Sequence, residues 1–268
     1  MRIAVAGGTG TLGRRVAAEL HSRGHDVRVL SRSSPEYRVD LTTGEGLAEA
    51  LVGCDAVVDA SNSQSSAKQA AQTLVEGSRR LLAAEEAAGV GHHVCVSIVG
   101  CDQLPMGYFK VKADQEAVVE QGPVPWTVVR ATQFHELMDM AFTAGARWRV
   151  LPVPRGRLQT VACAEVARAV ADVAEAAPRH GRFEVAGPET TDVRALARRW
   201  RALTGRRALL LPLPLPGRTG RALRAGVATS ERPDVRGTVL FDDWLRDKTA
   251  DGPAADRRKA DRRKACRR

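Results

Sequence analysis

The sequence has few lysines, few aromatic residues and no long apolar run. Its 268 residues include only six lysines against thirty-five arginines, and only two tyrosines. No apolar segment approaches the roughly 20 residues of a membrane-spanning helix, so we expect no membrane partner. The N-terminus opens directly on the strand-like segment RIAVAGG. We therefore expect no secretory signal peptide.

Cysteine is also scarce, and its positions form no recognisable pattern. Cys54, Cys95, Cys101, Cys163 and Cys266 match neither a disulfide framework nor a metal-ligand spacing. An odd number of scattered cysteines fits a reducing compartment. The sequence therefore predicts a cytoplasmic protein without a bound metal ion.

The formal net charge of +10 is unevenly distributed along the chain. The segment from Arg246 to Arg268 contains ten Lys and Arg against four Asp, so it carries +6 and the remainder only +4. This end has almost no apolar residues, which predicts a disordered, solubilising tail. A weak contact with nucleic acid or another acidic surface is the alternative. The rest of the chain has no basic stripe with interleaved aromatics, so we do not expect a nucleic-acid-binding protein.

Strand-like and helix-like segments alternate through the first half of the chain. The strand-like segments are buried runs of Val, Ile and Ala, as parallel strands covered on both faces should be. This alternation predicts an α/β fold with a Rossmann-type, doubly wound parallel sheet. Strands are expected at 2–7, 26–32, 37–41, 55–61, 92–100 and 125–132, and helices at 11–23, 46–52, 66–88, 107–121 and 136–147.

A glycine-rich turn lies between the first strand and the first helix. In AVAGGTGTLGRRV, three glycines form a G-x-x-G-x-x-G pattern. Small residues allow a tight turn and close approach of a pyrophosphate, and the helix N-terminus offers free N–H groups. The segment predicts a dinucleotide site; a purely structural turn is the alternative. The expected cofactor contacts are Gly7, Thr9, Gly10, Thr11, Leu12 and Gly13.

The ends of the next two strands indicate which dinucleotide binds. The second strand ends in VLSRSS, with Ser31 and Arg32 where NAD-binding folds usually carry an acid. A guanidinium can hold a 2′-phosphate and stack on adenine, so we predict NADP(H) as the cofactor. Asp40 and Leu41 are expected to flank the adenine, although Asp40 could equally cap the following turn.

The segment GYFKVKADQE places Tyr108 and Lys112 four residues apart in an expected helix. Side chains at i and i+4 share one helix face, so both can face one cleft. A free phenol has a pKa of about 10, and a neighbouring cation stabilises the phenolate. A compact ammonium is not replaced by a planar guanidinium, which explains a lysine in an arginine-rich chain. Packing of the tyrosine and solvation of the lysine are the alternatives.

Several motifs together resemble the short-chain dehydrogenase/reductase superfamily, and specifically its atypical NmrA-like and isoflavone-reductase-like NAD(P)-binding branch. They are GGTGTLG, SRSS, VSIVG, YFKVK and PWTVVRATQFHEL, within residues 1–200. The resemblance implies that Tyr108 donates a proton to a substrate carbonyl. It also implies that Lys112 binds the nicotinamide ribose and lowers the pKa of Tyr108, and that Ser97 orients the carbonyl.

Polar and aromatic residues also follow the expected fourth and sixth strands. In a doubly wound sheet, ligands bind beyond the carboxyl ends of the strands. His135 is a second candidate proton donor, with a helix-cap or packing role as the alternative. We expect Ser61, Asn62 and Thr132 to contact the cofactor, and Gln133, Phe134 and His135 to contact the substrate.

The pattern loosens after about residue 150. We expect an NADP-binding Rossmann domain over 1–150, a smaller substrate-binding portion over 151–247, and the disordered basic tail over 248–268. In the second of these, the segment LLLPLPLPG would line a hydrophobic substrate pocket.

These features predict an NADP-dependent oxidoreductase that reduces a small hydrophobic carbonyl, enone or quinone, with hydride from the nicotinamide and a proton from Tyr108. An aromatic or polyketide-like substrate, as in natural-product tailoring, would suit it. One alternative is a non-catalytic, NmrA-like regulator that senses NADP. Another is a tailoring enzyme in which the cofactor assists coupling or isomerisation. The expected partner is a small-molecule substrate, and a homodimer stays open.

Overall fold

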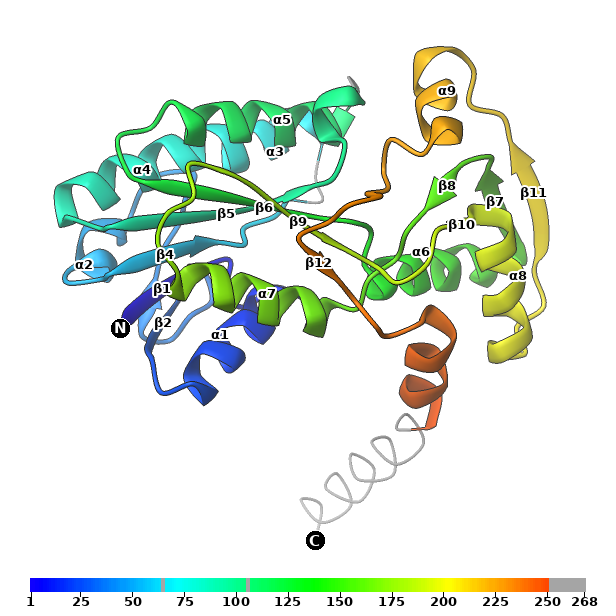
Figure 1. Cartoon of the computed structure of the whole chain (residues 1–268), viewed down its shortest axis with the longest axis horizontal. Helices are drawn as coiled ribbons and strands as arrows, with labels where there is room; N and C mark the ends of the chain where they lie inside the picture. The colour runs from blue at the N-terminus through cyan, green and yellow to red at the C-terminus, as the bar shows by residue number, and fades with distance from the viewer. Residues whose placement is uncertain (64–65, 105–106, 251–268) are drawn as a thin grey trace, which may run out of the picture.

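One large parallel sheet dominates the fold (Figure 1). The computed structural model describes residues 1–63, 66–104 and 107–250. Within them, eight strands pair in the order β12-β9-β6-β5-β4-β1-β2-β3, and every neighbouring pair is parallel. The predicted Rossmann-type α/β fold is confirmed. The strands are β1 (Arg2–Ala6), β2 (Asp26–Ser31), β3 (Tyr37–Arg38), β4 (Ala56–Asp59), β5 (His92–Ile98), β6 (Trp126–Ala131), β9 (Gly181–Ala186) and β12 (Val235–Arg236).

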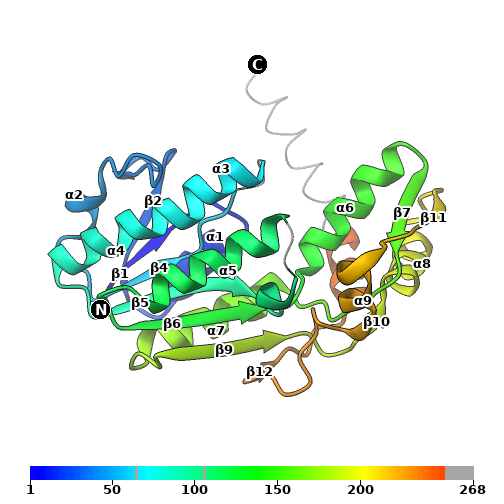
Figure 2. The same cartoon turned by 90° about the horizontal axis from the view of Figure 1, so that it is seen from above.

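Helices cover both faces of this sheet (Figures 1 and 2). Successive β1 residues enter opposite cores: Ile3 and Val5 pack towards α1 and α7, whereas Ala4 and Ala6 pack on the opposite side, towards α2, α4 and α5. Burial on both faces explains why the strands are continuous apolar runs. The helices are α1 (Gly13–Ser22) and α7 (Cys163–Glu175) on one face, and α2 (Leu47–Leu51), α3 (Ala67–Ala71), α4 (Gly77–Ala88) and α5 (Gly107–Glu120) on the other.

The helix expected over 66–88 is continuous but irregular. Its middle turn, Gln72–Glu76, is a π-helix between α3 and α4. Gly89 then ends α4 in the left-handed conformation, with φ of 71°.

The large sheet does not end at residue 150. The strands β9 and β12 extend its edge, and α7 packs on it, so part of the expected substrate-binding portion belongs to the sheet. The rest forms a smaller lobe around Trp200, Leu151 and Phe241, together with α6 from the end of the expected Rossmann domain. This lobe contains α6 (His135–Arg147), β7 (Val150–Pro154), β8 (Arg157–Leu158), β10 (Thr191–Asp192), α8 (Val193–Thr204), β11 (Leu209–Leu213) and α9 (Gly217–Ala225). The functional division of the chain stays a prediction.

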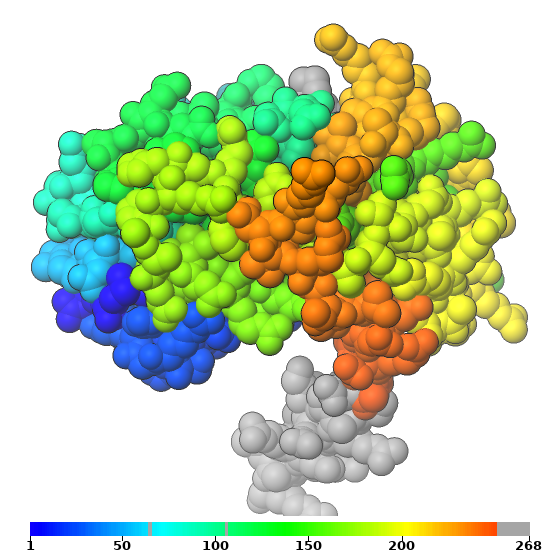
Figure 3. Space-filling view, in the orientation of Figure 1, coloured from blue at the N-terminus to red at the C-terminus, as the bar shows by residue number. Residues whose placement is uncertain are grey.

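The described chain ends in a helix over residues 241–250. Phe241 and Leu245, each 1% exposed, anchor it in the small lobe. The expected tail boundary at residue 248 therefore falls inside a helix. The remainder of the expected tail, including Cys266, lies outside the described residues. In the space-filling view, the segment before this helix lies between the part that contains the large sheet and the small lobe (Figure 3).

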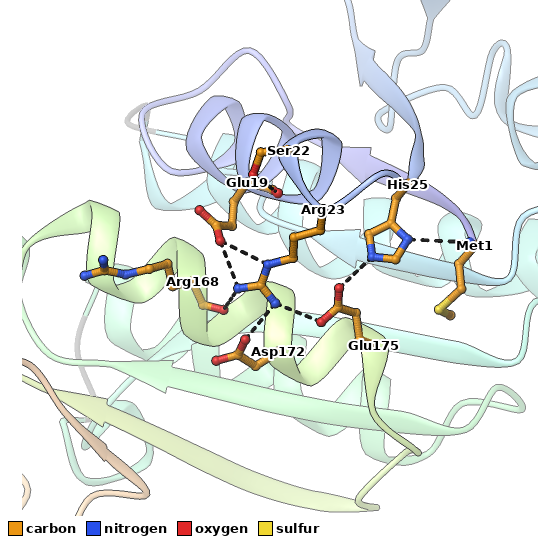
Figure 4. A network of polar contacts seen from close by, with 8 residues as sticks. All are labelled: Met1, Glu19, Ser22, Arg23, His25, Arg168, Asp172 and Glu175. Atoms are coloured by element: carbon orange, nitrogen blue, oxygen red, sulfur yellow. Dashed lines mark hydrogen bonds and ion pairs between the residues drawn. The ribbon is translucent and has the colours of Figure 1, made fainter.

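A cluster of charged side chains joins α1 to α7 (Figure 4). The guanidinium of Arg23 contacts Glu19 at 2.9 Å, Asp172 at 2.7 Å and Glu175 at 2.8 Å. The Nε2 atom of His25 lies 2.6 Å from the other oxygen of Glu175. The cluster therefore fixes how the two helices pack on their common face of the sheet.

No helix in the described residues combines the length and the apolar character that a membrane span requires.

Candidate functional site

A cleft of about 1210 Å³ lies at the carboxyl ends of the central strands. Residues that follow β1, β2, β4, β5 and β6 form its floor, and α5, α6 and helix 241–250 contribute to its walls. The strand order reverses between β1 and β4, which is where doubly wound sheets bind ligands.

The glycine-rich turn leaves no room for side chains. Gly7 has a φ of 69°, and a Cβ atom there would lie 2.7 Å from the Cα atom of Ser61. A Cβ atom on Gly13 would lie 2.3 Å from the carbonyl oxygen of Gly7. Helix α1 begins at Gly13 without a side-chain cap. The backbone N–H groups of Arg14 and Arg15 already donate to the carbonyl oxygens of Gly10 and Leu12, so those of Leu12 and Gly13 are the ones left for an anion at this end of the helix. The turn therefore fits a dinucleotide pyrophosphate, and Thr9, Gly10, Thr11 and Leu12 line the cleft beside it.

The predicted adenosine end is also part of the cleft, where Ser31, Arg32, Asp40 and Leu41 all line the wall. The carboxylate of Asp40 accepts hydrogen bonds from the backbone N–H of Thr42 at 2.8 Å and from its hydroxyl at 2.6 Å. These bonds hold the pKa of Asp40 below its usual value. Asp40 therefore caps this turn, and because it also lines the cleft its contact with the adenine stays a prediction.

The sequence reasoning missed Arg14, which lines the cleft directly after the last glycine of the turn. Its position in the first turn of α1, next to the expected pyrophosphate, was the available signal. Ser33 and Thr42 were missed at the adenosine end as well.

Tyr108 and Lys112 both line the cleft, as their spacing predicts. The hydroxyl of Tyr108 donates to the Oδ1 atom of Asn62 at 2.6 Å, which joins α5 to the loop after β4. Burial raises the pKa of Tyr108, and the positive charge of Lys112 only partly opposes this. Lys112 therefore lowers the pKa of Tyr108, as the resemblance implies, but burial raises this pKa by more and the net shift is upward. The phenol keeps its proton at neutral pH.

Lys112 is only 3% exposed, and its ammonium is held by two acceptors. It donates to the carbonyl oxygen of Val96 at 2.6 Å and to the side-chain oxygen of Gln115 at 2.5 Å. An ammonium has three N–H donors, so one remains for a ligand in the cleft.

A buried polar network, not foreseen from the sequence, supports Lys112. The amide of Gln115 donates to Asp59 and to Ser78, both at 2.9 Å. Asp59 also accepts from the hydroxyl of Ser78 at 3.0 Å and from the backbone N–H of Ser61 at 3.0 Å. The network therefore connects α5, α4 and the end of β4. In the sequence, only the polar residues at the end of the VVDAS segment indicated that a polar network could form here.

Ser97 lines the same cleft, but its hydroxyl lies within 3.7 Å of the thiol of Cys101. That thiol donates to Glu116 at 3.2 Å, and Glu116 pairs with Arg130 at 2.6 Å. Burial is the main cause that raises the pKa of Cys101 to about 11. Ser97 therefore belongs to a second buried network, and among the described residues it forms no hydrogen bond with Tyr108.

The residues after β6 divide between cleft and core. Thr132, Gln133 and Phe134 line the cleft, as predicted, but His135 does not. His135 is fully buried, its Nε2 atom lies 3.0 Å from the carbonyl oxygen of Val239, and its ring packs against Phe241. Burial lowers its pKa. The packing alternative therefore holds, and the expectation that His135 contacts substrate or donates a proton is wrong.

An apolar wall lies on the side of the cleft formed by α5, α6 and helix 241–250. Leu137 and Met140 are 45% and 50% exposed, which is high for side chains of this kind. By contrast, the segment LLLPLPLPG contributes no residue to the lining, so that expectation is wrong. The wall consists of Phe109, Phe134, Leu137, Met140 and Trp244.

A comparison with known families decides the kind of ligand. Residues 7–177 match a family model described as NAD(P)H-binding, which covers more than half of the chain. The chain belongs to this NAD(P)H-binding family. The predicted NAD(P)-binding family and the predicted pyridine-nucleotide cofactor are confirmed.

Relatives differ in how much of the chain they share. The photosystem II assembly factor Ycf39 of Trieres chinensis is 31% identical over 149 residues, which are 51% of this chain and 47% of that protein. The chain thus spans about half the length of this relative. The (4-alkanoyl-5-oxo-2,5-dihydrofuran-3-yl)methyl phosphate reductase of Streptomyces griseus is 31% identical over 209 residues, 72% of this chain and 70% of that protein.

Among solved structures, the fold is similar to that of the NADPH-dependent quinone oxidoreductase QOR2 from Escherichia coli, determined with NADPH. The TM-score is 0.73 with 18% identity, over 91% of this chain and 98% of the other. At this identity the likeness shows the fold alone.

Proposed function

We propose that this protein is an NADPH-dependent reductase of a small, largely apolar carbonyl, enone or quinone. The observation that carries the proposal is the arrangement of Tyr108 and Lys112. A protonated phenol and a buried ammonium line one cleft, which also contains the glycine-rich turn of an NAD(P)H-binding family.

Each end of the cleft has residues suited to one part of the cofactor. The N–H groups of Leu12 and Gly13, at the start of α1, would hold the pyrophosphate, and Arg32 would hold the 2′-phosphate of NADP. The remaining N–H of Lys112 would bind the nicotinamide ribose. When bound, the nicotinamide supplies a hydride to the substrate.

Tyr108 would supply the proton that completes the reduction. Because burial raises its pKa, the hydroxyl is protonated at neutral pH, as a general acid must be. Its hydrogen bond to Asn62 holds the oxygen at the cleft wall, and rotation about the C–O bond would turn the proton towards a substrate oxygen. The charge of Lys112 would stabilise the phenolate that is left behind.

The lining also supports an apolar substrate. Phe109, Phe134, Leu137, Met140 and Trp244 offer contact area without hydrogen-bonding groups, apart from the indole N–H. The relative from Streptomyces griseus is named as a reductase of a methyl phosphate compound that carries an alkanoyl group on a dihydrofuran ring, and the alkanoyl part of such a compound is compatible with this wall.

A second candidate function is a nucleotide-dependent binding protein without turnover. The matches to Ycf39 proteins, which are named as assembly factors, favour it. Such a protein needs the turn and the adenosine end of the cleft, but it needs no proton donor.

Oxidation of NADPH with a panel of quinones, enones and ketones tests the two proposals. For a reductase, Tyr108→Phe should lower kcat by about 10²- to 10⁴-fold while the Kd for NADPH changes little. Lys110→Gln is the control, because Lys110 lies on the same helix but is 63% exposed and outside the cleft lining; it should keep both kcat and the cofactor affinity. Tight NADPH binding without turnover on any substrate would instead support the binding protein.

A further inference from the structure

The small lobe carries an apolar surface that the cleft does not use. In the parallel pair of β7 and β11, Val150, Pro152 and Pro154 lie opposite Leu209, Leu211 and Leu213. Alternate residues of a strand point to opposite faces, and the intervening Leu151, Val153 and Leu210 pack into the small-lobe core. These six residues therefore form one outer face, which we call the β7–β11 face.

This face is exposed in the described structure. Leu209, Leu211 and Leu213 are 62%, 42% and 43% exposed. Trp148, immediately before β7, is 84% exposed. Figure 1 shows β11 at the outer side of the small lobe, and Figure 2 shows it there again from above. Large apolar patches of this kind mark contacts with proteins or membranes.

The two chain segments that contain the β7–β11 face carry charge of one sign. Residues 140–164 contain four arginines and residues 193–230 contain nine, and neither segment contains an Asp or a Glu. These thirteen positive charges exceed the net charge of the whole chain, +10, so the remaining residues sum to −3. One of the thirteen, Arg199, pairs with Glu189 and Asp242. Exposed arginines stand directly beside the face: Arg147 and Arg149 flank Trp148, and Arg206 and Arg207 precede β11.

We propose that the β7–β11 face docks the protein onto an anionic lipid surface. Exposed leucines with tryptophan suit the boundary between headgroups and acyl chains, and surrounding arginines suit anionic headgroups. Each basic residue near such a surface strengthens binding through the negative surface potential. The lack of a spanning segment does not bear on a contact of this kind, and the proposal does not depend on the reductase reaction.

Other occupants fit the face less well. If a second copy of this chain bound here, the arginines beside the two faces would repel each other, which disfavours a symmetric contact. Addition of a strand at the free side of β11 is hindered because Pro212 has no backbone N–H. A nucleic acid would gain little from a face of leucines and prolines, which has no side-chain hydrogen-bond donors.

Flotation of the full-length protein with lipid vesicles tests the proposal. The protein should bind vesicles of phosphatidylcholine with phosphatidylglycerol, bind phosphatidylcholine alone much less, and be released by salt. Leu211→Asp should weaken the binding to the anionic vesicles by at least about tenfold, through lost apolar contact and added repulsion. Val52→Asp is the matched control, because Val52 is 63% exposed but lies at the end of α2.

A second measurement distinguishes this face from the basic end of the chain. The fluorescence of Trp148 should shift to shorter wavelength on anionic vesicles, and Trp148→Phe should lose that shift. Arg147→Gln with Arg149→Gln should lower the vesicle affinity even if Leu211→Asp misfolds. Unchanged binding of these variants would overturn the proposal, because another basic region would then be responsible. Absence of vesicle binding by the unaltered protein would also overturn the proposal. If that protein instead self-associated and Leu211→Asp abolished the self-association, the face would be a contact between two copies of the chain.

Discussion

The buried network around Gln115 allows a specific prediction about the stability of this fold. Gln115 is fully buried and bonds to Lys112, Asp59 and Ser78. Gln115→Met keeps the approximate size of the side chain but removes all three hydrogen bonds. Two of the bonds involve charged groups, each worth about 1.5–3 kcal/mol, and some apolar burial is gained in return. We expect the free energy of unfolding to fall by about 2–4 kcal/mol.

Urea denaturation followed by circular dichroism measures this change. Asp114→Asn is the matched control on the same helix, because Asp114 is 46% exposed and pairs with Lys110 in solvent at 2.6 Å. The control should change stability by less than about 0.5 kcal/mol. The affinity for NADPH should also fall in Gln115→Met, because Lys112 loses one of its two fixed acceptors. If Gln115→Met were as stable as the control, the network would not hold Lys112 as argued here.

Three further predictions concern the cofactor, the α1–α7 contact and pH. Arg32→Ala should weaken NADPH binding by about 10- to 100-fold and NADH binding little, measured by fluorescence titration, and an equal loss for both would contradict a 2′-phosphate contact. Arg23→Ala should lower the free energy of unfolding by about 1–2 kcal/mol, because three carboxylates lose their shared cation, and the loss should be smaller at high salt. Arg168→Ala, which removes no ion pair of this cluster, is the control. Burial lowers the pKa of His93, but the carboxylate of Glu85, 2.9 Å away, raises it, and the net pKa of His93 lies well above its usual value. Burial also raises the pKa of Glu85. The folded state therefore binds extra protons, so stability should fall as the pH rises from neutral through the folded-state pKa of His93, and a flat urea midpoint over that interval would refute the shift.

The cofactor half of the site could be predicted because its signals are local. Gly7, Gly10 and Gly13 lie within seven residues, and close packing around Gly7 and Gly13 is the reason that they are glycines. Tyr108 and Lys112 lie on one helix, so their common face follows from helix geometry alone. The pKa of Tyr108 could not be read in the same way, since it depends on burial by segments distant in sequence.

The residues that the sequence reasoning misplaced are those that depend on packing. His135 follows β6 as a ligand-contacting residue would, but helix 241–250 packs against it and encloses its ring. The segment LLLPLPLPG has the composition of a pocket lining, yet its pairing with β7 turns three leucines outward. Composition alone cannot distinguish a segment that lines a pocket from one that forms an exposed face.

The sequence by itself determined the parallel sheet, the nucleotide turn and the Tyr–Lys pair. Each of these follows from short-range periodicity or spacing, which backbone geometry converts directly into structure. Only the tertiary structure decided that Gln115 meets Asp59 across 56 residues, that His135 belongs to the core, and that the β7–β11 face is left exposed. Contacts of this kind arise when whole elements pack together, and no local pattern in the chain encodes which side chains will then face each other.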